Sequence, residues 1–344
     1  MEKIKVGIIG CGKIAQVRHI PEYLASGKAE IAALYDLNKE RTEELAAKYG
    51  AKACSSIDEL LSLPLDAVSV CTANITHAEI TLKALSAGLN VLCEKPMAMN
   101  LSECEALVDA EKGSKGILMI GQNQRLAPAH ILAKELMAKG EIGRVISFTT
   151  TFGHGGPDTW SIDPGKNSWF FDPKKAVFGA TADLGVHKLD LICSLLDDTP
   201  AAVSAKLATL DKTYSDGSLI GVDDNAFMIL EMKSGVIGTM RASWTFYGSE
   251  DNTTVIYGTE GILRIYADQD YPVVIWKKDG TRVGYESEAI QTNDNQTSSG
   301  IIDSFIRGIE AGKSEISAAS NYPALKTVFA ALESSQTGKR VEIN

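Results

Sequence analysis

Short apolar runs alternate with helical stretches over the first third of the chain. The apolar runs are Lys5 to Ile9, Ile31 to Tyr35, Ala67 to Cys71, Asn90 to Cys93 and Ile117 to Ile120. Helical periodicity fills residues 38–48 and 76–87 between them, each with a glycine just beyond its end. Continuous apolar strands separated by helices are typical of a parallel sheet covered on both faces. The pattern therefore predicts an α/β domain with a doubly wound parallel sheet over residues 1–122.

After about Gln122, strand-like stretches alternate polar and apolar residues instead. The clearest such stretch extends from Val236 to Tyr247. Similar stretches cover residues 145–152, 226–232 and 253–257. This period of two is expected of an antiparallel sheet with two unlike faces. We therefore predict an α+β domain with a large, mainly antiparallel open sheet over residues 123–344. The pattern alone does not say which side of the 236–246 run faces a core and which an interface.

The last part of the chain has weaker patterning. Residues 281–300 are polar and weakly patterned, which predicts a mobile loop. Helical periodicity returns at residues 301–311 and 323–337, and the second of these helices is expected to pack back on the first domain.

Composition excludes several classes of protein. With 344 residues, of which 44% are hydrophobic, the chain is long enough for two globular domains. A net charge of -10 argues against a nucleic-acid surface. The sequence lacks both a signal-peptide pattern and a run of about 18 to 20 apolar residues, so we expect a cytoplasmic protein and no membrane partner. The six cysteines form no C-x-x-C pair and no histidines stand at ligand spacing, so neither a disulfide framework nor a metal site is expected.

A glycine-rich fingerprint follows the first predicted strand and opens a helix. It reads Gly10, Cys11, Gly12, Lys13, Ile14 and Ala15. In this context the first glycine permits a tight turn and the second lets the backbone approach a pyrophosphate, while the small final residue lets the helix pack close to the sheet. The phosphates would lie at the helix N-terminus, where backbone N–H groups favour negative charge. The fingerprint predicts a dinucleotide site.

An acidic residue, Asp36, ends the second predicted strand at the distance where a carboxylate binds the ribose hydroxyls of NAD. A carboxylate there would repel the 2′-phosphate of NADP. NAD is therefore favoured as the cofactor, although Asn38, Lys39 and Arg41 stand near enough in sequence to keep NADP as the alternative.

Two further clusters carry side chains suited to acid–base chemistry. Cys93-Glu94-Lys95-Pro96 ends a predicted strand, and ligands of open α/β sheets bind beyond the carboxyl ends of the strands. Asp183 and His187 stand four residues apart near the start of a predicted helix, so they share one helical face. Histidine, with an unperturbed pKa of about 6.5, is suited to accept a proton from an alcohol.

With these motifs in this order, the sequence resembles the Gfo/Idh/MocA oxidoreductase family, which includes glucose–fructose oxidoreductase and inositol dehydrogenases. The resemblance extends over essentially the whole chain. Besides the fingerprint, it rests on Thr72 with Asn74 and His77, on Glu94-Lys95-Pro96, on Asp183 with His187, and on the closing segment 333–341.

The resemblance implies an NAD-dependent oxidoreductase that acts on a secondary hydroxyl of a sugar, sugar derivative or inositol-like cyclic polyol. It implies Lys95, Asp183 and His187 as the catalytic residues: Lys95 holds the substrate oxygen, His187 is the acid/base, and Asp183 orients the imidazole or binds a neighbouring hydroxyl. The cofactor-binding residues would be Gly10, Cys11, Gly12, Lys13, Ile14, Asp36, Thr72, Asn74, His77 and Glu94. The family also implies a homodimer or homotetramer joined through the large sheet.

Polar donors beside aromatic side chains in the second domain suit a sugar or polyol. The candidate substrate contacts are Asn123, Arg125, His154, Trp160 and Trp169, each of which could equally be a loop or packing residue. The chain departs from the family pattern in having Ala73 after Thr72, and Phe178-Gly179-Ala180-Thr181 in place of a triple glycine. Two alternatives stay open: an NAD-dependent glycosidase, and a non-catalytic NAD-binding sensor or regulator.

Overall fold

The computed structural model describes residues 2–288 and 298–344. Contacts group the chain into two units. The first holds the chain up to Asn123 together with residues 298–322, and the second holds the chain from Gln124 and residues 323–344. Each unit is described by itself below.

The first unit contains a parallel sheet of six strands in the order β3-β2-β1-β4-β5-β6. The strands are β1 (Ile4–Ile9), β2 (Ala29–Tyr35), β3 (Lys52–Ala53), β4 (Ala67–Val70), β5 (Asn90–Cys93) and β6 (Leu118–Ile120). The order reverses between β1 and β4, which is the arrangement of a Rossmann sheet and creates a crevice at the carboxyl ends of these strands. The prediction of a doubly wound parallel sheet is confirmed.

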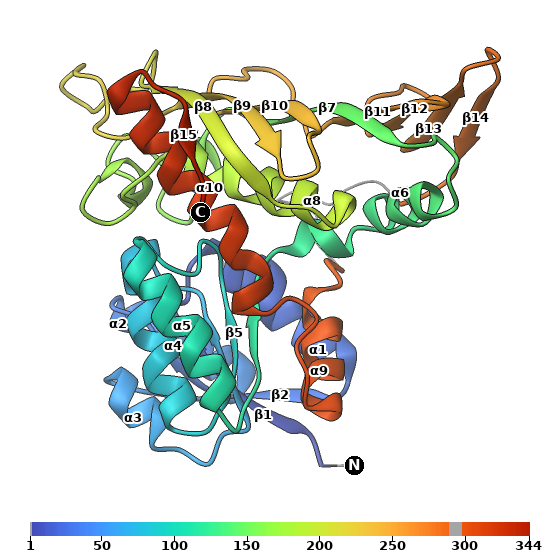
Figure 1. Ribbon diagram of the computed structural model, residues 1–344. Helices are drawn as coiled ribbons and strands as arrows, with labels where there is room; N and C mark the ends of the chain where they lie inside the picture. Colours follow the sequence, from blue (N-terminus) through green and yellow to red (C-terminus); the bar gives the residue numbers. More distant parts are fainter. Residues whose placement is uncertain (1, 289–297) are drawn as a thin grey trace. The chain divides into compact units, whose positions relative to one another are not determined.

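Helices cover both faces of this sheet. They are α1 (Ile20–Ser26), α2 (Lys39–Tyr49), α3 (Ile57–Leu61), α4 (His77–Ser86), α5 (Leu101–Gly113) and α9 (Ile301–Ala311), with a π-helical turn, η1 (Ala15–His19), ahead of α1 and a short 3-10 turn, η2 (Asn74–Thr76), ahead of α4. In Figure 1, α1 and α9 lie on one face while α4 and α5 lie on the other. Double coverage explains why the strands are apolar along their whole length.

The placement of α9 differs from the domain boundary expected from the sequence, which put everything after residue 122 in one domain. The backbone N–H of Ser299, just before α9, donates to Glu22 at 2.7 Å, and Lys28 pairs with Glu310 at 2.9 Å. The N–H of Ile120 also donates to the carbonyl of Ile316 at 2.9 Å. Long-range pairing of this kind leaves no local signal in the sequence.

The second unit contains a sheet of nine strands in the order β14-β13-β12-β11-β7-β10-β9-β8-β15. The strands are β7 (Val145–Gly153), β8 (Pro200–Ala208), β9 (Asn225–Met232), β10 (Ile237–Ser243), β11 (Thr254–Gly258), β12 (Gly261–Ile265), β13 (Val273–Lys277), β14 (Arg282–Tyr285) and β15 (Val341–Glu342). Among these described strands only β7 and β10 pair in parallel. The prediction of a mainly antiparallel sheet is confirmed.

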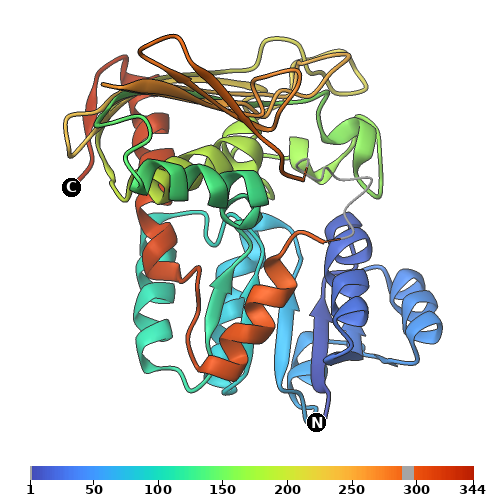
Figure 2. The ribbon, with the colours of Figure 1, turned by 90° about the vertical axis from the view of Figure 1, so that its right-hand side faces the viewer.

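Helices cover one face of this second sheet. They are α6 (Pro128–Ala138), α7 (Pro157–Trp160), α8 (Val186–Leu196) and the second-unit part of α10 (Ala318–Thr337), with 3-10 turns η3 (Asn123–Leu126) and η4 (Trp169–Phe171) and a π-helical turn η5 (Thr181–Gly185). Figure 2 shows α6 and α8 beneath the sheet, and none of the described helices lies on its opposite face. Met240 and Ala242 of β10 are buried, whereas Ile237, Thr239 and Arg241 are exposed. The structure thus assigns the even-numbered side of this strand to the core.

The residues of helix α10 are divided between the two units at Tyr322. Its part after Tyr322 groups with the second unit, where the hydroxyls of Ser334 and Ser335 accept the backbone N–H groups of Ala205 and Leu207, each at 2.9 Å. The expectation that residues 323–337 pack back on the first domain stays a prediction. No helix in the described part of the chain is long and apolar enough to cross a membrane.

Part of the loop predicted at 281–300 is a strand. Residues Arg282–Tyr285 form β14, which pairs with β13, so the prediction was wrong there, while residues 289–297 lie outside the described part. An Asp279-Gly280 turn connects the two strands, with Gly280 at a φ of 89°. That dipeptide is a hairpin signal and could have revealed the strand.

Candidate functional site

The fingerprint forms the loop that leaves β1 at the crevice of the first unit. Gly10 has a φ of 92°, and a Cβ there would lie 2.6 Å from the backbone carbonyl of Cys71. Only glycine fits, because the loop must cross the end of β4 closely in a left-handed conformation. Gly12 differs, since a Cβ there would meet no atom within 4 Å. The backbone at Gly12 therefore borders open space, as expected where a phosphate approaches a helix N-terminus.

This contrast predicts different results for two matched substitutions. Gly10→Ala is expected to destabilise the fold by about 2 to 4 kcal/mol, because it adds a backbone clash to an unfavourable φ. Gly12→Ala should leave the melting temperature unchanged but weaken NAD binding about tenfold, roughly 1.4 kcal/mol, because the new methyl group would occupy the phosphate's space. Thermal unfolding and titration with NAD measure the two effects. Equal NAD affinity in Gly12→Ala and wild type would contradict this account of the loop.

Asp36 lies directly beyond β2 and braces the same loop. Its Oδ2 accepts the N–H of Cys11 at 2.7 Å, and its Oδ1 accepts the N–H of Asn38 at 2.8 Å. The guanidinium of Arg41 lies 3.9 Å from Oδ1. A carboxylate has about four lone-pair positions, so Asp36 keeps acceptor capacity for ribose hydroxyls. The residues present therefore fit a dinucleotide with unmodified ribose hydroxyls.

A buried charge cluster supports the segment that carries Lys95. Oε1 of Glu94 lies 2.9 Å from Nε2 of His19 and 3.7 Å from the guanidinium of Arg18, and Oε2 accepts the N–H of Lys95 at 3.2 Å. Burial would raise the pKa of Glu94, but the hydrogen bond and charge of His19, with Arg18 and Lys95, hold that pKa well below its usual range. Glu94 was expected to bind the cofactor; its described partners are protein groups, and it positions the backbone of Lys95.

Glu94→Gln is expected to destabilise the protein by about 3 to 5 kcal/mol at pH 7, because it removes the carboxylate charge that lies against buried Arg18 and His19. The folded pKa of Glu94 is lowered, so its contribution is present above the unfolded value of 4.5 and is lost as the pH falls below that value. Denaturant unfolding at pH 7 and at lower pH should therefore show the difference between wild type and variant shrinking in acid. If the difference in unfolding free energy between wild type and Glu94→Gln were the same at every pH, the ionised carboxylate of Glu94 would not be its source.

His77 ties two loops of the crevice together. It is buried, with Nδ1 2.8 Å from the carbonyl of Pro96 and Nε2 3.0 Å from the carbonyl of Thr72. Burial lowers its pKa despite these two bonds and the nearby charge of Glu94. His77 was predicted to bind the cofactor, and these contacts show that it links the loop after β4 to the loop that follows Lys95.

The other predicted cofactor residues of the first unit lie in the fingerprint loop and in the loop after β4. Lys13 and Ile14 are half-buried in the fingerprint loop, and Cys11 is buried there, where burial first and then Asp36 raise the pKa of its thiol to about 12. Asn74 is buried at the start of η2. The structure thus gathers the predicted residues of this unit around the ends of β1, β2, β4 and β5.

In the second unit, Asp183 and His187 lie on consecutive helical segments, in η5 and α8. Asp223 holds the start of these segments, because its carboxylate accepts the N–H groups of Gly179 and Thr181, both at 2.8 Å. A Cβ at Gly179 would lie 1.8 Å from the carbonyl oxygen of Asp223. This close contact therefore requires glycine at position 179.

Both predicted catalytic side chains of this unit are buried among aromatic rings. The Nε1–H of Trp244 donates to Oδ2 of Asp183 at 3.0 Å, and Trp244 is fully buried. The ring of Phe152 lies 6.1 Å from that of His187. The site thus holds Asp183 in a fixed orientation in an apolar surrounding, where electrostatic interactions are strengthened.

Two further charged groups beside α8 have structural partners. Lys188 is fully buried and donates to the carbonyl of Asn252 at 3.1 Å, and burial lowers its pKa to about 7. Arg125, predicted as a substrate contact, forms a bidentate ion pair with buried Asp190. The Oδ2 of Asp190 accepts a hydrogen bond from Nε–H of Arg125 at 2.6 Å. The Arg125 guanidinium therefore anchors η3 to α8.

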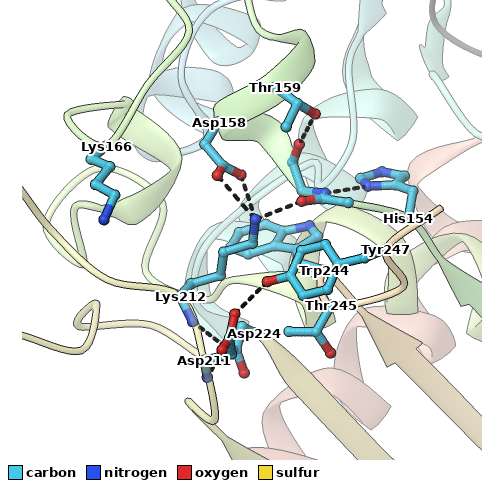
Figure 3. Close-up of polar contacts among 12 residues, drawn as sticks. His154, Asp158, Thr159, Lys166, Asp211, Lys212, Asp224, Trp244, Thr245 and Tyr247 are labelled. Carbon is cyan, nitrogen blue, oxygen red and sulfur yellow. Dashed lines mark hydrogen bonds and ion pairs between the residues drawn. The ribbon is translucent and has the colours of Figure 1, made fainter. Parts of the chain in front are cut away.

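The remaining substrate candidates of the second unit form an aromatic series. The ring of His154 lies 5.9 Å from Phe152 and 6.0 Å from Trp160, and Trp169 stacks on Phe170 at 3.9 Å. Nδ1 of His154 also accepts the N–H of Gly156 at 3.0 Å, as Figure 3 shows. Asn123 is half-buried at the start of η3, with its N–H bonded to the carbonyl of Gly121.

Sequence reasoning did not identify the supporting residues Arg18, His19, Asp223 and Trp244. Arg18 and His19 precede an apolar helix, and charged residues beside such a pattern signal a buried partner. Asp223 and Trp244 carry no such local signal.

Comparison with known proteins gives matches to both halves of the chain. Residues 4–122 match the model described as the oxidoreductase family, NAD-binding Rossmann fold, and residues 130–264 match the model of the GFO/IDH/MocA C-terminal domain.

Relatives of named activity match over most of their length. The 1,5-anhydro-D-fructose reductase of Ensifer adhaerens is 32% identical over 75% of this chain and 74% of its own. The inositol 2-dehydrogenase of Rhizobium meliloti (strain 1021) is 27% identical over 99% of both chains. Among solved structures, levoglucosan dehydrogenase in complex with NADH and levoglucosan has a TM-score of 0.87 and 26% identity, and the match covers 100% of both chains.

Proposed function

This chain belongs to the Gfo/Idh/MocA oxidoreductase family, and on that premise we propose that it is an NAD-dependent dehydrogenase of a sugar, sugar derivative or cyclic polyol. The reaction moves a hydride between nicotinamide and a secondary hydroxyl of the substrate. The observation that carries the proposal is the orientation of Asp183 by Trp244 next to His187, in a chain that also keeps Lys95 and the glycine loop. A protein that only sensed NAD would not require this acid–base pair.

In the proposed mechanism, bound NAD supplies the nicotinamide ring that takes the hydride. Lys95 donates a hydrogen bond to the substrate oxygen and balances its developing negative charge. His187 accepts the proton of the same hydroxyl during oxidation and returns it in the reverse direction. Asp183, held by Trp244, orients the imidazole or a neighbouring substrate hydroxyl.

The proposed cofactor preference rests on Asp36. Its carboxylate would bind the ribose hydroxyls of NAD and repel the 2′-phosphate of NADP, while Arg41, 3.9 Å away, partly balances its charge. Purified protein with NAD and a panel of inositols, aldoses and anhydrosugars should form NADH with at least one of them, measured by its absorbance. Glycoside cleavage without net NADH would favour the glycosidase alternative, and tight NAD binding without turnover of any kind would favour the sensor.

We also propose that the exposed face of the second sheet joins subunits into a homodimer or homotetramer. Three neighbouring apolar side chains support this, since Phe227 is 42% exposed, Ile229 is 52% exposed and Ile237 is 54% exposed. The protein is proposed to work in the cytoplasm, where its six buried thiols would stay reduced.

Ile229→Glu is expected to break the oligomer into smaller species, because a charge on this face would be buried without a partner. Light scattering after size-exclusion chromatography gives the mass. Thr239→Glu on the paired position of β10 is a second charge on the same face and should act in the same direction. An unchanged mass in both variants would rule out this face as the interface.

A further inference from the structure

A long segment without strands separates β7 from the helix that carries Asp183 and His187. Residues 154–172, called here the wall segment, contain only the short helix α7 and the turn η4 as regular structure. They also carry the aromatic rings of His154, Trp160, Trp169 and Phe170. Because so little regular backbone pairing holds the segment, its position depends on side-chain contacts from elsewhere.

Three consecutive residues of another loop supply those contacts. Lys212 donates to the carbonyl of Gly155 at 2.6 Å and to both carboxylate oxygens of Asp158 at 2.8 and 3.0 Å, as Figure 3 shows. The hydroxyl of Thr213 accepts a hydrogen bond from Lys166 at 2.9 Å. The hydroxyl of Tyr214 donates to the carbonyl of Phe171 at 2.8 Å. Residues 212–214, called here the clasp, thus hold the wall segment at its start, middle and end.

Asp224 and Tyr247 in turn hold the clasp and the residues just before it in place. Asp224 is fully buried and accepts the backbone N–H groups of Leu210, Asp211 and Lys212, each at 2.8 Å. The hydroxyl of Tyr247 donates to Asp211, and its ring lies 5.2 Å from the ammonium of Lys212. Lys212 is only 6% exposed, so its pairing with Asp158 is shielded from solvent and is stronger than a surface ion pair.

The wall segment connects to both predicted catalytic residues of this unit through aromatic contacts. From His187 the series runs through Phe152 to His154 and then to Trp160.

The series then returns toward the helix. Trp160 contacts Phe170 at 5.4 Å, and Phe170 lies 6.4 Å from Trp244, which bonds Asp183. The contacts of Lys212, at Gly155 and Asp158, fall between His154 and Trp160 in the sequence. Displacement of this part of the segment would therefore move the rings beside Asp183 and His187.

We propose that Lys212 is a positioning residue that holds the wall segment against the Asp183–His187 helix, so that its aromatic rings form one side of the substrate site. This inference rests on the proposed function. Aromatic faces are well suited to the C–H faces of a sugar or cyclitol ring. Lys212 acts through Asp158 and Gly155 and does not touch substrate itself, so its loss should weaken substrate binding more than it slows the chemical step.

The test compares Lys212→Met, Asp158→Asn and the double variant with wild type and with Lys233→Met, an exposed lysine between β9 and β10. With the sugar or polyol that wild type oxidises, Lys212→Met should raise KM about tenfold while kcat and the affinity for NAD change little. Asp158→Asn should act in the same direction, and the double variant should be less than additive because both changes break one pair. Lys212→Arg should recover part of the loss.

Hydrogen exchange supplies a readout that does not depend on turnover. Amides of residues 155–171 should exchange faster in Lys212→Met and remain as in wild type in Lys233→Met. Faster exchange spread evenly over the second unit, or an unchanged KM in an otherwise active Lys212→Met, would overturn the inference and leave the proposed function standing. A wild type that oxidises no substrate of the panel would overturn the proposed function and, with it, the substrate role of the wall segment.

Discussion

His187→Asn is expected to lower kcat by about 10²- to 10⁴-fold, because no other group is assigned to accept the hydroxyl proton. Asparagine keeps a similar size beside Phe152 but cannot take up a proton. Steady-state rates over a range of pH measure the effect, and the limb of the kcat profile that reports histidine protonation should disappear.

The matched control is His154→Asn, a histidine that contacts the same Phe152 ring from the wall segment. It should change KM more than kcat, since its proposed role is contact with substrate. NAD affinity should stay at the wild-type value in both variants, because the glycine loop belongs to the other unit. If His187→Asn kept wild-type kcat, another residue would have to be the acid/base.

Lys95→Met is expected to reduce kcat/KM by about 10²- to 10³-fold, the range found when one group that stabilises an oxyanion is removed. Methionine keeps the length of the side chain and removes its charge and donors. The backbone at residue 95 should stay in place in the variant, because Oε2 of Glu94 accepts its N–H and this bond does not depend on the side chain at that position.

Lys115→Met, an exposed lysine of the same unit, is the control for loss of one positive charge. It should match wild type in turnover and in melting temperature. Turnover measured with NAD and the best substrate of the panel gives the comparison. A Lys95→Met enzyme with undiminished kcat/KM would remove Lys95 from the mechanism and leave the dehydrogenase assignment to rest on His187.

Local sequence predicted the parts of the nucleotide site that depend on local backbone. Gly10 is required by a left-handed φ and a close backbone contact, and its place after an apolar strand already marked it. The same reasoning missed β14, although the Asp279-Gly280 turn before it is a local signal that was available. The extent of strands was less predictable. The alternation predicted a strand that continues to Tyr247, but β10 ends at Ser243, where the hydroxyl of Ser243 accepts the N–H of Thr245.

Partnerships between distant residues required the tertiary structure. Trp244 and Asp183 are 61 residues apart, and His19 and Glu94 are 75 apart, so no spacing rule connects them. The clasp has the same character, since Lys212 lies in a loop, Asp158 lies in α7, and 54 residues separate them in the sequence.

The sequence by itself determined the two kinds of sheet, the position of the dinucleotide loop and the residues suited to proton and hydride chemistry, because periodicity and turn residues act on neighbouring positions. Only the tertiary structure decided which side of residues 236–246 is covered, which unit holds α9, and which buried groups orient Glu94 and Asp183. The physical reason is that each buried polar group needs a hydrogen-bond partner, and this partner is a group that the tertiary fold places beside it. Those partners are set by packing, not by separation along the chain.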